Sequence, residues 1–399
     1  MTTPHHPGLR TLAVHAGEGP DPTTRASAPN LVMSTTFLID PDVAFSAEEL
    51  EPGAPFVYTR WGNPTVRQLE DKLAALEGAE AGMGFASGMA AIAALFADVL
   101  LPGDHLIMSD VAYAGASELV NSIVPRGGVE VSRVDLSDLA ALQAALRPST
   151  KLVYVETPAN PILRLTDIAA VAEVTHAAGA KLVVDSTFGT PVATRPVELG
   201  ADFVLHSLTK YIGGHGDAVG GALIGSEQDL TQIRRGPGVH VGGVMSPFNA
   251  WLIMRGAATL PVRMRVHEEG ALEVARFLEG HRRVTRVLYP GLPSHPQHEL
   301  ARRQMDNFAG MVSFCVEDGP GAASRLARDL HTVHYAVSLG HHRSLIVYLP
   351  TADLLTTSFR MDAAQEAAYR EYAGDGLFRL SVGLEDAADI IADLEQALA

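Results

Sequence analysis

The chain has 399 residues, of which 47% are hydrophobic and 19% are charged, and its formal net charge is −16. This length and composition indicate a globular protein with a sizeable core, organised as two domains or as one large domain and a smaller one. The negative charge and the lack of basic runs argue against a nucleic-acid partner, and no apolar run reaches the roughly 18–20 residues that span a bilayer.

The first residues and the cysteine content predict a cytoplasmic location. Residues 1–19 lack the basic and then apolar layout of a signal peptide. Cys315 is the single cysteine, which rules out an internal disulfide and fits a reducing compartment. It lies in the alternating segment MVSFCVE, so we expect a buried structural thiol.

The pattern along the chain predicts three parts. Residues 1–60 are rich in Pro, Gly, Thr and Ser and indicate an extended arm. In residues 61–256, short β-branched runs alternate with helical patterns, which is typical of parallel βαβ units. Residues 257–399 favour a smaller domain that is mainly helical with a few strands, after a long linking helix over 246–281 that breaks near Pro261.

Within this pattern the individual elements follow in a fixed order. We expect a helix between the first two of four buried strands, two strand-like pieces later in the chain, and a closing helix over 385–399. The four strands are 151–156, 181–185, 201–207 and 220–226, and the two later pieces are 311–317 and 334–339.

Polar residues follow the buried strands at the points where the strands end. Glu156, Thr157 and Asn160 follow the first strand and Asp185 ends the second, while Ser207, Thr209 and Lys210 follow the third. Ligands of open α/β sheets lie beyond the carboxyl ends of the strands, so these side chains are predicted to share one crevice. Lys210 alone would suit a solvated loop. Beside these polar residues it suggests a lysine that forms a Schiff base with an aldehyde.

A second candidate lies at the start of an apolar helix. In GFASGMAAIAALFADVL, Ser87 and Gly88 precede the apolar residues, and a helix N-terminus offers free N–H groups to a phosphate. The segment is no P-loop, because the Gly-Lys-Ser/Thr ending is absent. We therefore expect a phosphate site made by backbone groups.

These motifs together resemble a known family. HSLTKYIGGHGD, with YTRWGNPT, ASGM, ETPANP and VVDSTF in the same chain, is similar to the pyridoxal-phosphate enzymes of cysteine and methionine metabolism. The resemblance implies an α/β fold of the aspartate aminotransferase-like type (fold type I), with a mostly parallel sheet in the large domain and a smaller α+β C-terminal domain. It also implies pyridoxal 5'-phosphate as the cofactor and a sulfur-containing amino acid as the substrate.

The resemblance assigns roles around the cofactor ring. Lys210 would bind the cofactor aldehyde and then shuttle protons, and Asp185 would keep the pyridine nitrogen protonated. Tyr113 would stack on the ring and act as an acid toward the leaving group, and Asn160 would bind the ring hydroxyl.

Further roles concern the phosphate and the substrate carboxylate. The phosphate would be bound by two hydroxyl side chains and two backbone amides, which are those of Ser207, Thr209, Gly88 and Met89. Arg379 would clamp the substrate carboxylate, with Ser338 beside it. Tyr58 and Arg60, in the arm, would reach the phosphate of a neighbouring subunit, so the resemblance implies self-association as a dimer or tetramer with shared active sites.

The segment AVSLG favours one activity within the family. Val337 stands where cystathionine-processing relatives carry an acidic residue, and an apolar side chain suits the methyl group of methionine. We therefore expect methionine γ-lyase activity, with O-acetylhomoserine sulfhydrylase and cystathionine γ-lyase or γ-synthase as the alternatives. Gly115, where methionine γ-lyases often show a cysteine, departs from that expectation.

Two other readings complete the expectations. The histidines around HTVHYAVSLGHH do not have the spacing of a metal site, so no metal is expected. A non-catalytic α/β protein that binds a phosphorylated ligand is the alternative from another class. It gives no reason for Lys210, Asp185, Tyr113 and Arg379 to occur together.

Overall fold

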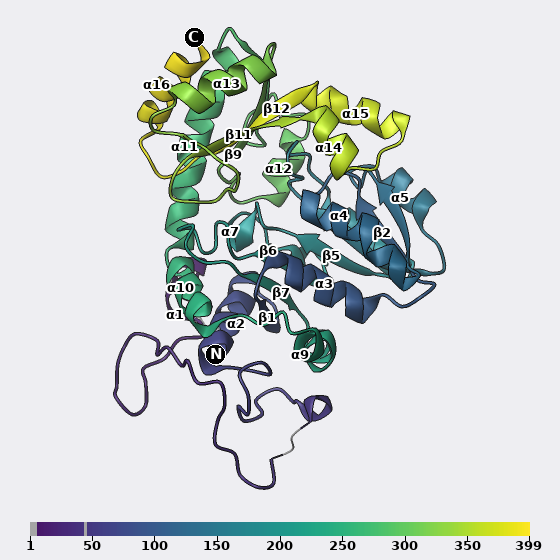
Figure 1. Ribbon diagram of the computed structural model, residues 1–399, viewed down its shortest axis with the longest axis vertical. Coiled ribbons are helices and arrows are strands. Elements are labelled where there is room, and N and C mark those ends of the chain that lie inside the picture. Colours follow the sequence, from purple (N-terminus) through teal and green to yellow (C-terminus); the bar gives the residue numbers. More distant parts are fainter. Residues whose placement is uncertain (1–5, 44–45) are drawn as a thin grey trace, which may run out of the picture.

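The computed structural model describes residues 6–43 and 46–399, which form an arm followed by two β-sheets flanked by helices. Figure 1 shows the larger sheet in the middle of the molecule and the smaller sheet beside it, with the long helix α11 along one side. The predicted division at residues 60 and 256 stays a prediction.

The larger sheet has seven strands in the order β1-β7-β6-β5-β4-β2-β3. All its pairings are parallel except the two that β7 makes, with β1 and with β6. The mostly parallel sheet expected from the sequence is confirmed. The strands are β1 (Ala81–Phe85), β2 (His105–Ser109), β3 (Glu130–Val134), β4 (Thr150–Glu156), β5 (Lys181–Asp185), β6 (Phe203–Ser207) and β7 (Gly221–Gly225).

The antiparallel direction of β7 follows from its connection to β6. Parallel neighbours need a crossover segment, usually a helix, whereas residues 208–220 contain no helix. The chain therefore turns back along β6. This turn contains Lys210, which places the lysine at the carboxyl end of β6.

Both faces of this sheet are buried, as parallel strands require. Leu205 and Leu223 pack with α3 on one face, and Val204 and Ile224 pack with α2 and α10 on the other. Because side chains alternate along a strand, Ser207 points to the same face as Leu205. That face carries the site described below.

The helices begin mostly at residues that can cap them or at prolines in the first turn. Asn63, Ser87, Asp138, Asp167 and Ser226 each accept an N–H of the first turn. The helices up to the long linker are α1 (Leu9–His15), α2 (Pro64–Glu77), α3 (Gly88–Val99), α4 (Ala114–Ser122), α5 (Leu139–Ala145), α6 (Ile168–Ala177), α7 (Thr190–Ala193), α8 (Glu227–Ile233) and α9 (Val239–Val241).

The linker is two helices, α10 (Pro247–Ala257) and α11 (Leu260–Gly280). Pro261 lies in the first turn of α11, where its missing N–H costs no hydrogen bond. The break predicted near this proline is confirmed. The later helices are α12 (His298–Gln304), α13 (Gly319–Asp329), α14 (Thr351–Thr357), α15 (Ala363–Ala373) and α16 (Ala387–Leu398).

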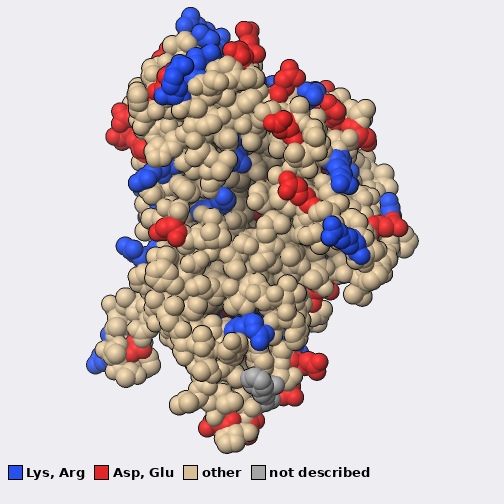
Figure 2. Space-filling view, viewed as in Figure 1, with Lys and Arg blue, Asp and Glu red and all other residues tan. Residues whose placement is uncertain are grey.

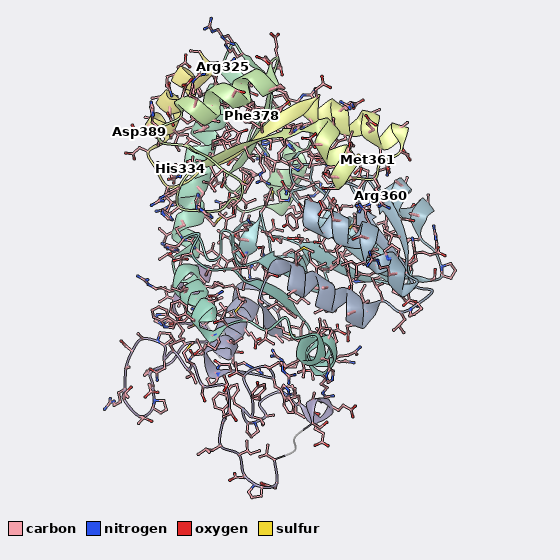
Figure 3. All side chains as sticks on the ribbon, in the orientation of Figure 1. Arg325, His334, Arg360, Met361, Phe378 and Asp389 are labelled. Atoms are coloured by element: carbon pink, nitrogen blue, oxygen red, sulfur yellow. The ribbon has the colours of Figure 1, made fainter. Side chains whose placement is uncertain are left out.

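The smaller sheet has five strands in the order β10-β11-β12-β9-β8, and only β10 and β11 are parallel. On one face, Phe378, labelled in Figure 3, stacks on Phe314 with ring centroids 5.2 Å apart. Arg379, the next residue, therefore points to the other face. The strands are β8 (Val284–Leu288), β9 (Met311–Val316), β10 (His334–Tyr335), β11 (Leu345–Pro350) and β12 (Gly376–Ser381).

Two details of this region bear on the sequence-based expectations. Cys315 is buried, and burial raises the pKa of its thiol to about 11, as fits a structural cysteine. The expected strand over 334–339 is too long, because pairing ends at Tyr335. The chain then leaves the sheet, which brings Val337 and Ser338 to the cavity described below.

Figure 1 shows the arm as loops that extend beyond α2 and β1, and its described residues are largely irregular apart from the helix α1 and one short turn of 3₁₀-helix. The helix α1 (Leu9–His15) is an element that the sequence pattern did not predict. Ala13 is fully buried there, and Lys72 of α2 donates a hydrogen bond to its carbonyl oxygen at 2.6 Å. Packing against α2 thus stabilises a helix that the local sequence does not predict.

Candidate active site

A cavity of about 430 Å³ lies at the carboxyl ends of β4, β5 and β6, beside the N-terminus of α3. It is lined by the residues predicted from the sequence except Tyr58, Arg60 and Thr157, and Thr157 instead accepts the N–H of Thr166 at 3.1 Å. The lining includes Gly88, Met89, Tyr113, Asn160, Asp185, Ser207, Thr209, Lys210, Val337, Ser338 and Arg379. The crevice predicted beyond the strand ends is therefore present, and residues of the C-terminal part close its other side.

Lys210 presents its amine to this cavity. Its Nζ donates a hydrogen bond to the Ser338 hydroxyl at 2.8 Å. Burial, helped by the positive charge of Arg379, lowers the pKa of Lys210 to about 8. A lowered pKa raises the fraction of neutral amine near pH 7, and only the neutral amine is a nucleophile.

Ser338 holds Lys210 and Arg379 together through a strained backbone. Its φ is +93°, which a residue with a Cβ rarely adopts. In this conformation its hydroxyl meets Lys210, and its carbonyl oxygen accepts a hydrogen bond from Nη2 of Arg379 at 3.1 Å. Backbone strain of this kind is concentrated at functional sites.

Asp185 is a buried carboxylate at the end of β5. The hydroxyl of Tyr154 donates to its Oδ2 at 2.9 Å, and the backbone N–H of Thr187 donates to its Oδ1 at 3.1 Å. Burial raises the pKa of Asp185 despite these hydrogen bonds. A positive group arriving in the cavity would therefore stabilise the ionised carboxylate.

The N-terminus of α3 forms one end of the cavity. The Ser87 hydroxyl accepts the N–H of Ala90 at 3.1 Å, and Gly88 and Met89 occupy the first turn, where backbone N–H groups lack partners inside the helix. A Cβ at position 88 would lie 3.3 Å from the Cβ of Ser207, so glycine leaves room there. Backbone donors and the hydroxyl groups of Ser207 and Thr209 together suit a phosphate.

Arg379 lies opposite, on β12. Its Nη1 donates to Asn160 Oδ1 at 2.9 Å. Its Nε is buried and has no hydrogen-bond partner within residues 6–43 and 46–399. Burial lowers the pKa of Arg379 to about 10, which leaves it charged at neutral pH. An unsatisfied guanidinium donor in a cavity suits an anionic ligand such as a carboxylate.

Tyr113 forms part of the mouth of the cavity, at the start of α4. Its side chain is 45% exposed, while its backbone N–H donates to Glu156 Oε2 at 2.7 Å. On the same helix, Asn121 donates to the carbonyl oxygen of Ser358 at 2.8 Å. Arg360 and Met361, labelled in Figure 3, follow this contact in the segment between α14 and α15.

The pair from the arm lies outside the cavity of its own chain. Arg60 Nη1 donates to the carbonyl oxygen of Val239 at 2.8 Å, and the guanidinium carbon lies 5.5 Å from the Tyr58 ring centroid. The Tyr58 side chain is 39% exposed. The single chain thus leaves both residues at its surface, away from Lys210.

Comparison with known proteins decides the family. The family profile described as Cys/Met metabolism PLP-dependent enzyme matches residues 10–399. The chain belongs to this family. The cofactor and the enzyme class expected from the sequence are thereby confirmed.

Several members of the Cys/Met metabolism family are similar to this chain over its length. Cystathionine γ-synthase of Mycobacterium tuberculosis is 45% identical over 391 residues, which cover 98% of this chain and 97% of that protein. L-methionine γ-lyase of Pseudomonas putida is 41% identical, with 98% and 97% covered. The crystal structure of metB from Corynebacterium glutamicum has a TM-score of 0.87 at 41% identity and covers 98% of both chains. These relatives show an enzyme of γ-elimination or γ-replacement with the fold type I architecture.

The cavity fits the pyridoxal phosphate of the Cys/Met metabolism family. It offers an amine with a lowered pKa, a buried carboxylate, a helix N-terminus and an arginine with an unsatisfied donor. These groups match an aldehyde, a pyridine nitrogen, a phosphate and a substrate carboxylate respectively. The family resemblance therefore agrees with the chemistry of the donors.

The sequence-based prediction passed over Thr187 in this cavity and gave Glu156 a place in the crevice but no role. Thr187 lines it, donates its N–H to Asp185 and accepts the N–H of Ser207 at 2.9 Å. Glu156, the last residue of β4, lines it as expected and is the register partner of Asp185, the last residue of β5. Both residues lie in motifs that the sequence analysis had singled out, Glu156 in ETPANP and Thr187 in VVDSTF.

Two observations concern metals and membranes. In the described part of the chain, no cluster of three or more His, Cys, Asp or Glu side chains could hold a metal ion. No helix in the same part is long and apolar enough to cross a membrane. Figure 2 shows basic and acidic side chains interspersed over the face in view.

Proposed function

We propose that this enzyme cleaves the Cγ–S bond of L-methionine and releases methanethiol, 2-oxobutanoate and ammonia. The observation that carries this proposal is the apolar mouth of the cavity, where Val337 is 75% exposed and Val219 is 51% exposed. Both carboxylates that line the cavity, Glu156 and Asp185, are buried at strand ends and already accept hydrogen bonds. A distal ammonium group would find no free acidic partner among these lining residues.

Each residue around the cofactor ring has one proposed role. When bound, pyridoxal phosphate accepts the electrons left as a proton leaves the substrate Cα. Lys210 would take that proton and then a second one from Cβ, which allows the sulfur to leave Cγ, and Asp185 would keep the pyridine nitrogen protonated. Arg379 holds the substrate carboxylate, and Asn160 binds the ring hydroxyl. Tyr113 lies at the mouth, where it would donate a proton to the departing sulfur.

The phosphate end is assigned in the same way. We infer that the hydroxyl groups of Ser207 and Thr209 and the backbone N–H groups of Gly88 and Met89 bind the phosphate. Ser338 would help to orient the substrate carboxylate, because its carbonyl oxygen already fixes Arg379. The cytoplasmic location stays a prediction from the sequence.

Changing Val337 to Glu is expected to shift substrate preference from methionine toward cystathionine. The new carboxylate could pair with the distal ammonium of cystathionine, and a hydrogen bond to a charged group contributes about 1.5–3 kcal/mol. The ratio of the two kcat/KM values should therefore change by about tenfold or more in favour of cystathionine. Competition assays with purified wild-type enzyme and variant measure it.

Val337→Gln is the matched control, since glutamine has nearly the same size as glutamate but carries no charge. It should lower methionine cleavage without a comparable gain for cystathionine. A clear preference of the unmodified enzyme for cystathionine would contradict the proposal.

The alternative within the family is γ-replacement, which the 45% identity to a cystathionine γ-synthase favours. The same assays therefore include O-succinylhomoserine with cysteine and O-acetylhomoserine with sulfide. A higher kcat/KM with either pair than with methionine would assign the enzyme to synthesis.

We also propose that Tyr58 and Arg60 complete the active site of a neighbouring subunit, so that the enzyme is at least a dimer. Mixed with inactive Lys210→Ala chains, inactive Arg60→Ala chains should regain activity, because a hybrid dimer has one site with both residues intact. About a quarter of the wild-type activity is expected, since half of the dimers are hybrids and each has one intact site of two. The measurement is turnover after refolding the mixture, with subunit exchange checked by mass spectrometry. Exchange without recovery would contradict the shared site.

A further inference from the structure

Glu156 is a buried carboxylate at the end of β4, and none of the proposed roles involves it. Its residue is 5% exposed, and it lines the cavity beside Asp185, its register partner on β5. Its two oxygens accept two different backbone N–H groups. Tyr113 donates to Oε2 at 2.7 Å, and Asn160 donates to Oε1 at 2.9 Å.

These two donors belong to separate segments of the chain. Tyr113 directly precedes α4, whereas Asn160 lies in the loop that follows β4. The Tyr113 side chain is 45% exposed, so its placement over the cavity depends largely on where its backbone is held. Asn160 in turn accepts a hydrogen bond from Arg379. One carboxylate thus links three of the proposed functional residues.

We propose that Glu156 is a positioning residue that holds Tyr113 and Asn160 at the distance the cofactor ring requires. The inference rests on the proposed roles of these two residues. It does not depend on methionine being the substrate.

The chemistry of the side chain supports this assignment. A carboxylate presents two acceptor oxygens and no donor, whereas a glutamine would turn its NH₂ group toward one of the two N–H groups. Burial and then the charge of Asp185 raise the pKa of Glu156, whereas the two backbone N–H groups of Tyr113 and Asn160 act in the opposite direction and favour the ionised carboxylate. Both oxygens are occupied by backbone donors, so a part in proton transfer is not required.

The test measures cofactor affinity, which needs no amino-acid substrate. Glu156→Gln should keep the fold and weaken binding of pyridoxal phosphate by about 10- to 100-fold, because the negative charge is lost and one of the two N–H groups loses its acceptor. Asp393→Asn is the matched control. Asp393 is also buried and accepts the N–H groups of Thr332 and Val333 at 2.8 Å, but it does not line the cavity. It should lower Tm and leave cofactor affinity unchanged.

A double-mutant cycle separates positioning from a general loss of stability. Tyr113→Ala should weaken cofactor binding strongly in the wild-type background and much less in the Glu156→Gln background, because the Tyr113 ring is already displaced in that variant. Additive effects, or unchanged cofactor affinity in Glu156→Gln, would overturn the proposal. If Glu156→Gln does not fold, Glu156→Asp takes its place, since its shorter side chain cannot reach both N–H groups. Methionine cleavage can fail in every variant without affecting this result.

Discussion

Lys210→Ala is expected to abolish the covalent link to pyridoxal phosphate and nearly all turnover. The amine is the group in the cavity that can bind the cofactor aldehyde, and the same amine would carry the substrate proton. Proton transfer alone contributes about 10²–10⁴-fold to rate, so the loss should exceed that range once the covalent link is also gone. The measurements are borohydride trapping followed by peptide mass spectrometry, and turnover with methionine.

Ser338→Ala is the control, since it removes the 2.8 Å hydrogen bond to Nζ but keeps the amine. It should retain the trapped adduct. A trapped adduct in Lys210→Ala, or turnover near the wild-type rate, would contradict the assignment.

The lowered pKa of Lys210 adds a pH dependence to this prediction. Because the neutral amine reacts, the rate of cofactor uptake by the cofactor-free enzyme should rise with pH, with a midpoint near 8 rather than near the ordinary lysine value. Arg379→Gln removes the nearby positive charge and should move the midpoint upward. Burial, the larger cause, is unchanged in that variant.

Much of the site could be predicted from the sequence because the strands are short, apolar and end in polar residues. The runs before Glu156, Asp185 and Ser207 have that form, and parallel pairing brings their ends to one edge. The position of Lys210 follows from the same pattern. These features depend on local sequence and on one topological rule.

What could not be predicted depends on contacts between distant segments. The turn of the chain at Ser338, with its φ of +93°, is set by hydrogen bonds to Lys210 and Arg379, which are 128 and 41 residues away. The helix at Leu9–His15 depends on packing against α2. Glu156 was visible as a polar residue, but its two backbone donors became apparent only in three dimensions.

Asp185→Ala should slow removal of the substrate Cα proton by about 100- to 1,000-fold while some cofactor still binds. The range is that of a single electrostatic group in a water-excluded site. Asp185 is buried, and burial raises the pKa of its carboxyl, so the ionised form needs a positive partner. In the proposed role of Asp185, a protonated pyridine nitrogen would supply that partner, and each would stabilise the charge of the other.

Exchange of the methionine Cα proton in deuterated water, followed by NMR, isolates this step from the later cleavage. Asp185→Asn should resemble Asp185→Ala, since it keeps the shape and loses the charge. Tyr154→Phe is the matched control, because it removes the 2.9 Å hydrogen bond to Oδ2 and leaves the carboxylate in place. Its effect should stay within about tenfold, the worth of one hydrogen bond. Near-normal exchange in Asp185→Ala would show that the charge of this residue does not promote proton removal. An equal loss of exchange rate in all three variants would assign the effect to packing around β5.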